Sequence, residues 1–157
     1  MIRGVVLHNF KSFTDAELRF GNVSVVVGAN GAGKSNLFDA LRFLKAIGEG
    51  RSVRDAIEGH ATPLATTAIV QSVRGGAESI VHFNSKSTEF ALTVKLLVDQ
   101  DIIEYFVRID AARYRVVQEE LKSKLHPGSY VFSTKPESGP LEQDPESPVV
   151  IARFYKE

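Results

Sequence analysis

The chain has no cysteine and no tryptophan among its 157 residues. Without cysteine, neither a disulfide framework nor a thiolate metal site can form. Lysine plus arginine and aspartate plus glutamate each number 19, so the formal net charge is zero and gives no overall attraction for nucleic acid. No apolar run reaches the roughly 18 residues of a membrane span, and the first residues lack a signal-peptide layout. These absences predict a cytoplasmic protein without membrane contact.

The apolar content, in contrast, is ordinary for a globular protein. Hydrophobic residues make up 43% of the chain, and ten of them are phenylalanine. A chain of this length can bury one substantial core and is short for two. We therefore expect a single domain over residues 1–157.

The most informative segment is Gly28–Ser35, which fits the phosphate-binding pattern G-x-x-x-x-G-K-[ST] at every fixed position. A mostly β-branched run, Val23–Val27, precedes it, and an amphipathic helix with Leu37, Leu41 and Leu44 on one face follows it. Glycines let a backbone wrap around an anion, and the N–H groups of the loop and the helix start then face the phosphates. The alternative, a glycine-rich turn without a ligand, explains neither the lysine nor this context.

Each polar residue of this segment has a predicted role. Lys34 would reach the β- and γ-phosphates as a point charge and is the predicted catalytic residue. Ser35 would supply a hydroxyl ligand to Mg²⁺, and Asn36 would lie toward the α-phosphate. The predicted nucleotide-binding residues here are Gly28, Asn30, Gly31, Ala32, Gly33, Lys34, Ser35 and Asn36.

Residue patterns along the chain predict an α/β fold with α+β character. A P-loop core, with helices at Lys34–Ile47 and Ser52–Glu58, is expected over residues 1–60, and an antiparallel β-rich subdomain over residues 78–155. Residues Lys135–Pro148, rich in proline, glutamate, serine and glycine, are expected to form a surface loop. Strands are predicted at Met1–Phe10, Ala16–Phe20, Asn22–Gly28, Ser79–Asn84, Phe90–Val98, Ile102–Ile109, Tyr114–Leu121, Tyr130–Ser133 and Val149–Tyr155.

A family resemblance rests on three segments: Leu7–Phe13, Phe20–Val23 and Val27–Leu41. Together they resemble the start of SMC/RecF-type ATPases of the ABC class, which include AAA-annotated predicted ATPases and overcoming-lysogenization-defect (OLD) type proteins. The spacing is close over residues 1 to about 45. The resemblance implies the N-terminal lobe of an ATPase head that binds ATP and Mg²⁺, in DNA repair, chromosome maintenance or phage defence. It also implies that Lys11, Ser12 and Phe13 lie near the nucleotide, the alternative being a solvated turn.

Several motifs of that class are missing from this chain. Arg74-Gly75-Gly76 precedes an expected strand and is interpreted as a turn instead of a signature segment. Leu96–Asp99 imitates a Walker B strand, but Gln100 follows, and the flanking alternation favours a hairpin tip. The resemblance therefore implies a half-site that hydrolyses ATP slowly or not at all alone. A C-terminal lobe or a second head, in a homodimer, would complete it, and binding to DNA has no support from charge.

Two other functions stay open at this point. One is a complete small phosphotransferase or GTPase with Asp99 as the magnesium acid, although alternating βα units are missing after residue 60. The other is a non-catalytic interaction module that uses a nucleotide as a brace.

The remaining polar residues carry weaker hypotheses. Arg108, Arg113 and Arg115 form a basic cluster that either contacts a partner or lies on a solvated strand face, and Glu104 is expected to face solvent. The histidines lack metal-ligand spacing, and no choice can be made among three glutamines as the γ-phosphate sensor. These residues are His8, His60, His82, His126, Gln71, Gln118 and Gln143.

Overall fold

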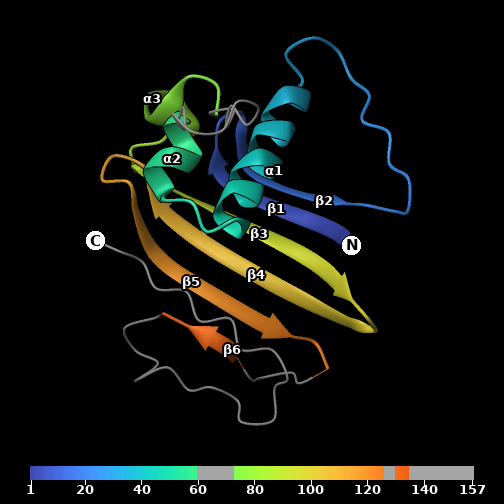
Figure 1. Ribbon diagram of the computed structural model, residues 1–157. Coiled ribbons are helices and arrows are strands. Elements are labelled where there is room, and N and C mark those ends of the chain that lie inside the picture. The colour runs from blue at the N-terminus through green and yellow to red at the C-terminus, as the bar shows by residue number, and fades with distance from the viewer. Residues whose placement is uncertain (60–72, 126–129, 135–157) are drawn as a thin grey trace, which may run out of the picture.

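A computed structural model describes residues 1–59, 73–125 and 130–134 of the chain. Six strands form one sheet in the order β2-β1-β3-β4-β5-β6, and each neighbouring pair is antiparallel. Figure 1 shows α1 lying diagonally across one face of this sheet. The strands are β1 (Ile2–Phe10), β2 (Phe13–Arg19), β3 (Glu89–Val98), β4 (Asp101–Asp110), β5 (Arg115–Ser123) and β6 (Tyr130–Ser133). The helices are α1 (Lys34–Gly48), α2 (Val53–Glu58) and α3 (Gly76–Ile80).

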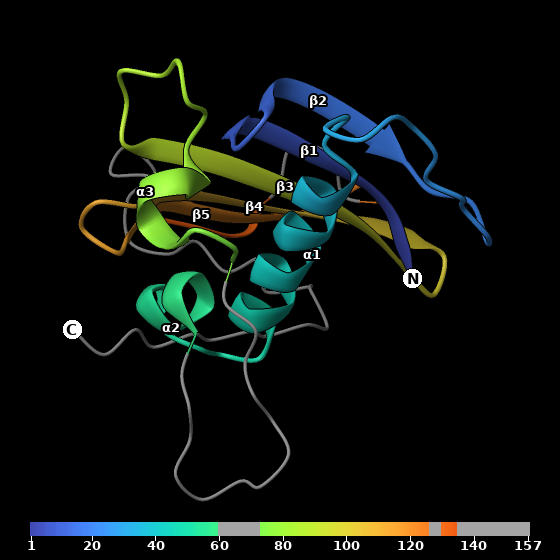
Figure 2. The same ribbon diagram turned by 90° about the horizontal axis from the view of Figure 1, so that it is seen from above.

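All three helices lie on the same side of the sheet, as the view in Figure 2 shows. Strand residues alternate between a buried inner face and a polar outer face, the pattern of a sheet covered on one side. Val5, Leu92 and Val107 are fully buried on the inner face. His8 and Arg108, on the outer face, are exposed.

Three phenylalanine rings, packed one against the next, connect α1 to the sheet. The ring centroids of Phe43 and Phe90 are 5.3 Å apart, and those of Phe90 and Phe10 are 5.5 Å apart, both in edge-to-face geometry. All three rings are essentially fully buried. Since Phe43 lies on α1 and the other two rings on β3 and β1, this contact fixes the helix that follows the P-loop.

Most predicted elements agree with the structure within a few residues. The strands expected at Phe90–Val98 and Ile102–Ile109 are β3 and β4, joined by a tight turn at Asp99 with a φ of 53°. The pair Val98 and Asp101 closes this hairpin in register. Asp99 is therefore at a hairpin tip, as the alternation predicted.

The strand predicted at Asn22–Gly28 is wrong for this chain. Residues 20–29 form no strand, and Figure 1 shows the segment as a blue trace between β2 and α1, outside the sheet. Val23, Val25 and Val27 are 86%, 81% and 83% exposed. A strand needs a hydrogen-bonded neighbour, and the part of the chain that the structure describes places none beside these valines.

The strand predicted at Ser79–Asn84 is also wrong. The turn predicted at Arg74-Gly75-Gly76 is present at Arg74 and Gly75, but it leads into a helix instead of a strand. Gly75, with φ of 81°, is the N-cap of the short helix α3, which ends at Ile80. Only Val81 retains an isolated bridge, to Phe10. The positive φ values of Gly75 and Gly76 allow the chain to turn directly into this helix.

Some expectations fall outside the described residues. These are the strand at Val149–Tyr155, the loop at Lys135–Pro148, and any role of His60, His126, Gln71 or Gln143.

The Asp110 carboxylate, buried at the β4–β5 turn, makes the fold sensitive to acid. A hydrogen bond from Arg113 Nη1, 2.7 Å away, and weaker ones from backbone N–H groups hold the pKa of Asp110 below its ordinary value of 3.8. A carboxyl with a depressed folded pKa stabilises the protein above the unfolded pKa, and this stabilisation is lost as pH falls through the folded pKa.

We therefore expect Asp110→Asn to lose less stability than the wild type between about pH 6 and about pH 2. Urea unfolding across that range measures the difference. Arg113→Ala should remove part of the same pH-dependent stabilisation. Parallel acid profiles for wild type and both variants would contradict the assignment.

Candidate functional site

The P-loop, Gly28–Ser35, has two glycines in a backbone conformation that other residues rarely adopt. Gly31 and Gly33 have φ values of 84° and 87°, in the left-handed region that favours glycine. Gly33 is the N-cap of α1, and no side chain caps the helix there. No acidic residue lies in the first turn of α1. The first N–H groups of the helix are thus available to an anion.

The Lys34 side chain lies back over the loop. Its Nζ donates hydrogen bonds to the carbonyl oxygens of Gly28 and Ala29, at 2.6 and 2.7 Å. Ser35 is exposed and Asn36 is partly exposed. These contacts place the ammonium group at the mouth of the loop, with Ser35 following at the first turn of the helix.

The turn between β1 and β2 packs directly against the P-loop. A Cβ added to Gly33 would lie 2.9 Å from Ser12 Oγ and 3.0 Å from Phe13 Cζ. Asn36 Nδ2 also donates a hydrogen bond to Ser12 Oγ at 2.8 Å. Ser12 and Phe13 are therefore neighbours of the candidate nucleotide site, although β1 precedes the loop by many residues.

Lys11 takes a different direction from its two neighbours. Its side chain is only 8% exposed, and Nζ lies 3.2 Å from Asp39 Oδ2. The same group donates a hydrogen bond to the carbonyl oxygen of Arg74 at 2.6 Å. The prediction that Lys11 binds the nucleotide remains untested, and the contacts seen are with protein groups.

Asp39 is a polar centre that sequence reasoning missed. Its carboxylate is fully buried on α1 and contacts Lys11, Arg42 and Arg74. Arg74 Nη2 and Nε both donate to Oδ2, at 3.0 and 3.1 Å. One signal was available in the sequence: Asp39 precedes Phe43 by four residues and so shares its helix face.

The Walker B imitation lies far from this loop. Figures 1 and 2 both show the β3–β4 turn well apart from the N-terminal end of α1. The antiparallel pairing of β3 with β4 also differs from the parallel strand that a magnesium acid beside a P-loop would end.

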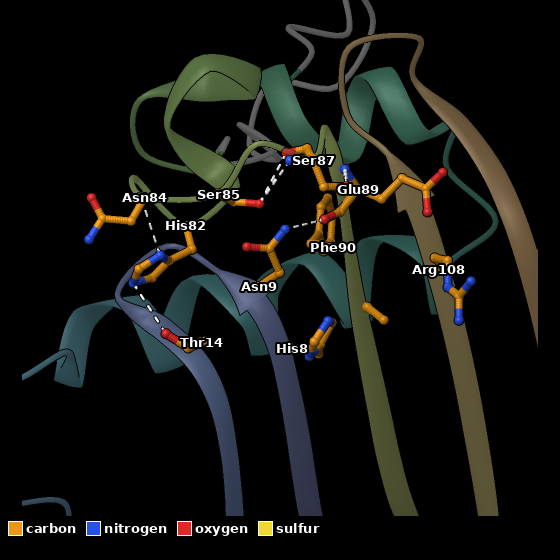
Figure 3. Close-up of a pocket in the computed structure, with 11 residues that line it drawn as sticks. His8, Asn9, Thr14, His82, Asn84, Ser85, Ser87, Glu89, Phe90 and Arg108 are labelled. Carbon is orange, nitrogen blue, oxygen red and sulfur yellow. Dashed lines mark hydrogen bonds between the residues drawn. The ribbon is translucent and has the colours of Figure 1, made fainter.

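A polar pocket of about 640 Å³ lies near the start of β3 on the outer side of the sheet (Figure 3). His8 and His82, distant in sequence, both line it. His8 Nδ1 is 2.5 Å from Asp15 Oδ1, but both side chains are mostly exposed, so this pair adds little stability. Within the described ranges no three histidine, aspartate or glutamate residues are grouped as a metal site.

Two arginines of the predicted basic cluster, Arg108 and Arg113, have different surroundings in the structure. Arg113 pairs with Asp110, whereas Arg108 lines the polar pocket and lies 5.8 Å from the ring centroid of Phe106. Glu104, about 30% exposed, lies within 4.0 Å of Lys95 and Lys124. These contacts fit a solvated strand face better than a common binding patch.

Leu41 and Leu44, predicted on the buried face of α1, are only partly buried. They line an apolar cavity of about 280 Å³ with Tyr105 and Glu119.

In the described part of the chain, no helix is long and apolar enough to cross a membrane.

Comparison with known families gives a match over most of the chain. Residues 1–126 match the family described as the RecF/RecN/SMC N terminal domain. The match covers the P-loop, the Asp39 contacts and strands β1 to β5. No curated protein matches the chain.

Proposed function

Because the chain belongs to the RecF/RecN/SMC N-terminal domain family, we propose that it binds ATP with Mg²⁺ through Gly28–Ser35 as one half of an ATPase site. The observation that carries the proposal is the uncapped N-terminus of α1 behind two left-handed glycines, Gly31 and Gly33. This arrangement presents backbone donors and a helix dipole to a phosphate chain. Membership of the family also supports DNA repair, chromosome maintenance or phage defence as the setting.

The residues around the loop fit a nucleoside triphosphate. Lys34 needs only to exchange the Gly28 and Ala29 carbonyls for phosphate oxygens, which are stronger acceptors for an ammonium group. The Ser35 hydroxyl would hold Mg²⁺, which would neutralise phosphate charge when bound. Asn36, Ser12 and Phe13 would form the wall beside Gly33, with Ser12 oriented by the Asn36 amide.

The exposed valines support a site that a further element completes. Val23, Val25 and Val27 precede the loop and have the β-branched composition of a strand buried on both faces. Their exposure indicates that they require a neighbouring strand beyond those described here. We propose that a second lobe or a second ATPase head supplies this strand together with the missing magnesium acid. The hairpin at Asp99 disfavours a complete small phosphotransferase.

Replacing Val23, Val25 and Val27 together with serine should leave the free energy of unfolding within about 0.5 kcal/mol of wild type, because these side chains are exposed. The wild type should self-associate with rising concentration through this apolar segment, and the triple variant should do so less. Urea unfolding and sedimentation measure the two effects. Val5→Ser, at a fully buried site, is the destabilising control. A triple variant as unstable as that control would show that the valines are packed in solution.

The direct test of the proposed function is calorimetric titration with Mg·ATP. Lys34→Ala should weaken binding at least about 30-fold, because charge-assisted hydrogen bonds to the phosphates are lost. Lys45→Ala removes an exposed cation from the same helix and should bind as wild type does. Phosphate release by the wild type should equal that by Lys34→Ala. Equal affinity for ATP in wild type and Lys34→Ala would overturn the proposal, and Lys34-dependent turnover would overturn the half-site.

A further inference from the structure

Three segments distant in sequence meet at the Asp39 carboxylate. Lys11 comes from the β1–β2 turn, Arg74 from the segment before α3, and Asp39 itself from α1. Arg42, three residues along the same helix, also contacts Asp39 and is itself 45% exposed. The carboxylate is fully buried and the Lys11 side chain is 8% exposed, so this ion pair is largely removed from solvent.

The Lys11 backbone needs such an anchor. Its φ is 51°, in the left-handed region where a side chain other than glycine is strained. Three contacts hold it there: the Asp39 carboxylate, the Arg74 carbonyl oxygen, and a backbone hydrogen bond from Lys11 N to Ile80 O at 2.8 Å. The conformation of this turn is thus held by the Asp39 carboxylate on α1 and by the backbone carbonyl oxygens of Arg74 and Ile80.

Ser12, the next residue, connects the β1–β2 turn to the P-loop through its contacts with Asn36 and Gly33. Ser12 Oγ accepts the Asn36 amide hydrogen bond and occupies the space that a Cβ on Gly33 would fill. Arg74 Nη2 approaches the other end of the same amide, with Asn36 Oδ1 3.5 Å away. A shift of Lys11 would move Ser12 away from both Gly33 and Asn36.

We propose that Asp39 is a positioning residue for the nucleotide site, acting through Lys11 to hold Ser12 against Gly33 and Asn36. The inference rests on the proposed function for its effect on nucleotide affinity. Asp39 itself would touch no ligand, since its two oxygens are occupied by protein cations. A neutral side chain of the same shape would leave Lys11 without a counter-charge and release the turn.

A double-mutant cycle on Mg·ATP affinity tests this path. Asp39→Asn should weaken binding about tenfold, as Ser12 loses its fixed position. In a Ser12→Ala background the same substitution should change affinity less than about twofold, because the group it acts through is gone. Multiplicative effects of the two substitutions, or full affinity in Asp39→Asn, would overturn the proposal. If Asp39 had only a structural role, Asp39→Asn would lower the free energy of unfolding equally in the wild type and in the Ser12→Ala variant.

Two substitutions at Lys11 distinguish an effect on the position of Ser12 from an effect on folding. Lys11→Arg keeps the cation and should retain the affinity, whereas Lys11→Met should weaken it as Asp39→Asn does. Where Asp39→Asn alone fails to fold, the Lys11→Met/Asp39→Asn pair replaces the buried ions by neutral groups and keeps the test available. Wild-type affinity in that pair would overturn the proposal.

A measurement without nucleotide distinguishes this inference from the proposed function. In the ligand-free protein, Asp39→Asn should speed hydrogen exchange at the amides of Lys11 and Leu37, which bond to Ile80 O and Gly33 O. Lys45→Ala should leave both amides as in wild type. Unchanged exchange would overturn the positioning role whether or not ATP binds. Absence of Lys34-dependent ATP binding, with faster exchange in Asp39→Asn, would overturn the proposed function and retain the coupling of Asp39 to the turn.

Discussion

Phe43→Ala is expected to lower the free energy of unfolding by about 3–5 kcal/mol, the usual cost of removing a buried phenylalanine ring. The Phe43 ring is fully buried and packs edge-to-face on Phe90, 5.3 Å between centroids, which in turn packs on Phe10. Its loss leaves a cavity between α1 and the sheet and removes the contact that seats the P-loop helix. Urea or thermal unfolding measures the change, with a fall in melting temperature of roughly 6–20 °C.

Phe38→Ala is the matched control for this prediction. Phe38 lies on the same helix but is 50% exposed, so its loss should change stability by no more than about 1 kcal/mol. Equal destabilisation by the two substitutions would mean that α1 is rotated in solution relative to the structure. Phe43→Ala should also weaken Mg·ATP binding if the helix start moves with the ring.

Gly33→Ala is expected to weaken Mg·ATP binding about 10- to 100-fold through two combined effects. A side chain at a φ of 87° costs about 1–2 kcal/mol. The added Cβ would also lie 2.9 Å from Ser12 Oγ and 3.0 Å from Phe13 Cζ, an overpacking that typically costs about 1–3 kcal/mol. The loop and the β1–β2 turn would have to separate, which disturbs the site on both sides. Calorimetric titration measures the affinity.

Gly31→Ala separates the two effects in the ligand-free protein. Gly31 has a similar φ of 84°, but an added Cβ would meet nothing within 4 Å. Thermal unfolding should therefore show a smaller loss for Gly31→Ala than for Gly33→Ala, the difference reporting the contact with Ser12 and Phe13. Identical melting temperatures for the two variants would show that the turn does not press on Gly33.

Local patterns were sufficient for much of the fold and for the loop. The alternation in Phe90–Val98 and Ile102–Ile109 predicted a hairpin, because a residue's face in a strand depends only on its position along that strand. Gly28–Ser35 predicted a phosphate loop, because its glycines and lysine act within one short stretch of chain. The structure has the hairpin and gives Gly31 and Gly33 the left-handed conformation that the loop needs.

Patterns failed where a segment depends on distant partners. Val23–Val27 has strand composition, but a strand forms only beside another strand, and the described sheet ends at β2. Ser79–Asn84 was also predicted as a strand, yet Ser79 and Ile80 belong to α3 and Val81 makes an isolated bridge to Phe10. On α1, periodicity predicted an apolar face of Leu37, Leu41 and Leu44. Leu37 is buried, but Leu41 and Leu44 are only partly buried, and the sheet covers Ala40 and Phe43 fully instead.

The sequence by itself determined that this protein has a glycine-rich loop of the phosphate-binding pattern ahead of a helix, and a mainly antiparallel β-rich remainder. These features follow from neighbouring residues, whose backbone and side-chain preferences act locally. Only the tertiary structure decided that Ser12 and Phe13 face Gly33 and that Lys11 and Arg74 converge on buried Asp39. Such contacts join residues far apart in the chain, and their geometry exists only after the sheet brings α1, the β1–β2 turn and α3 to the same side.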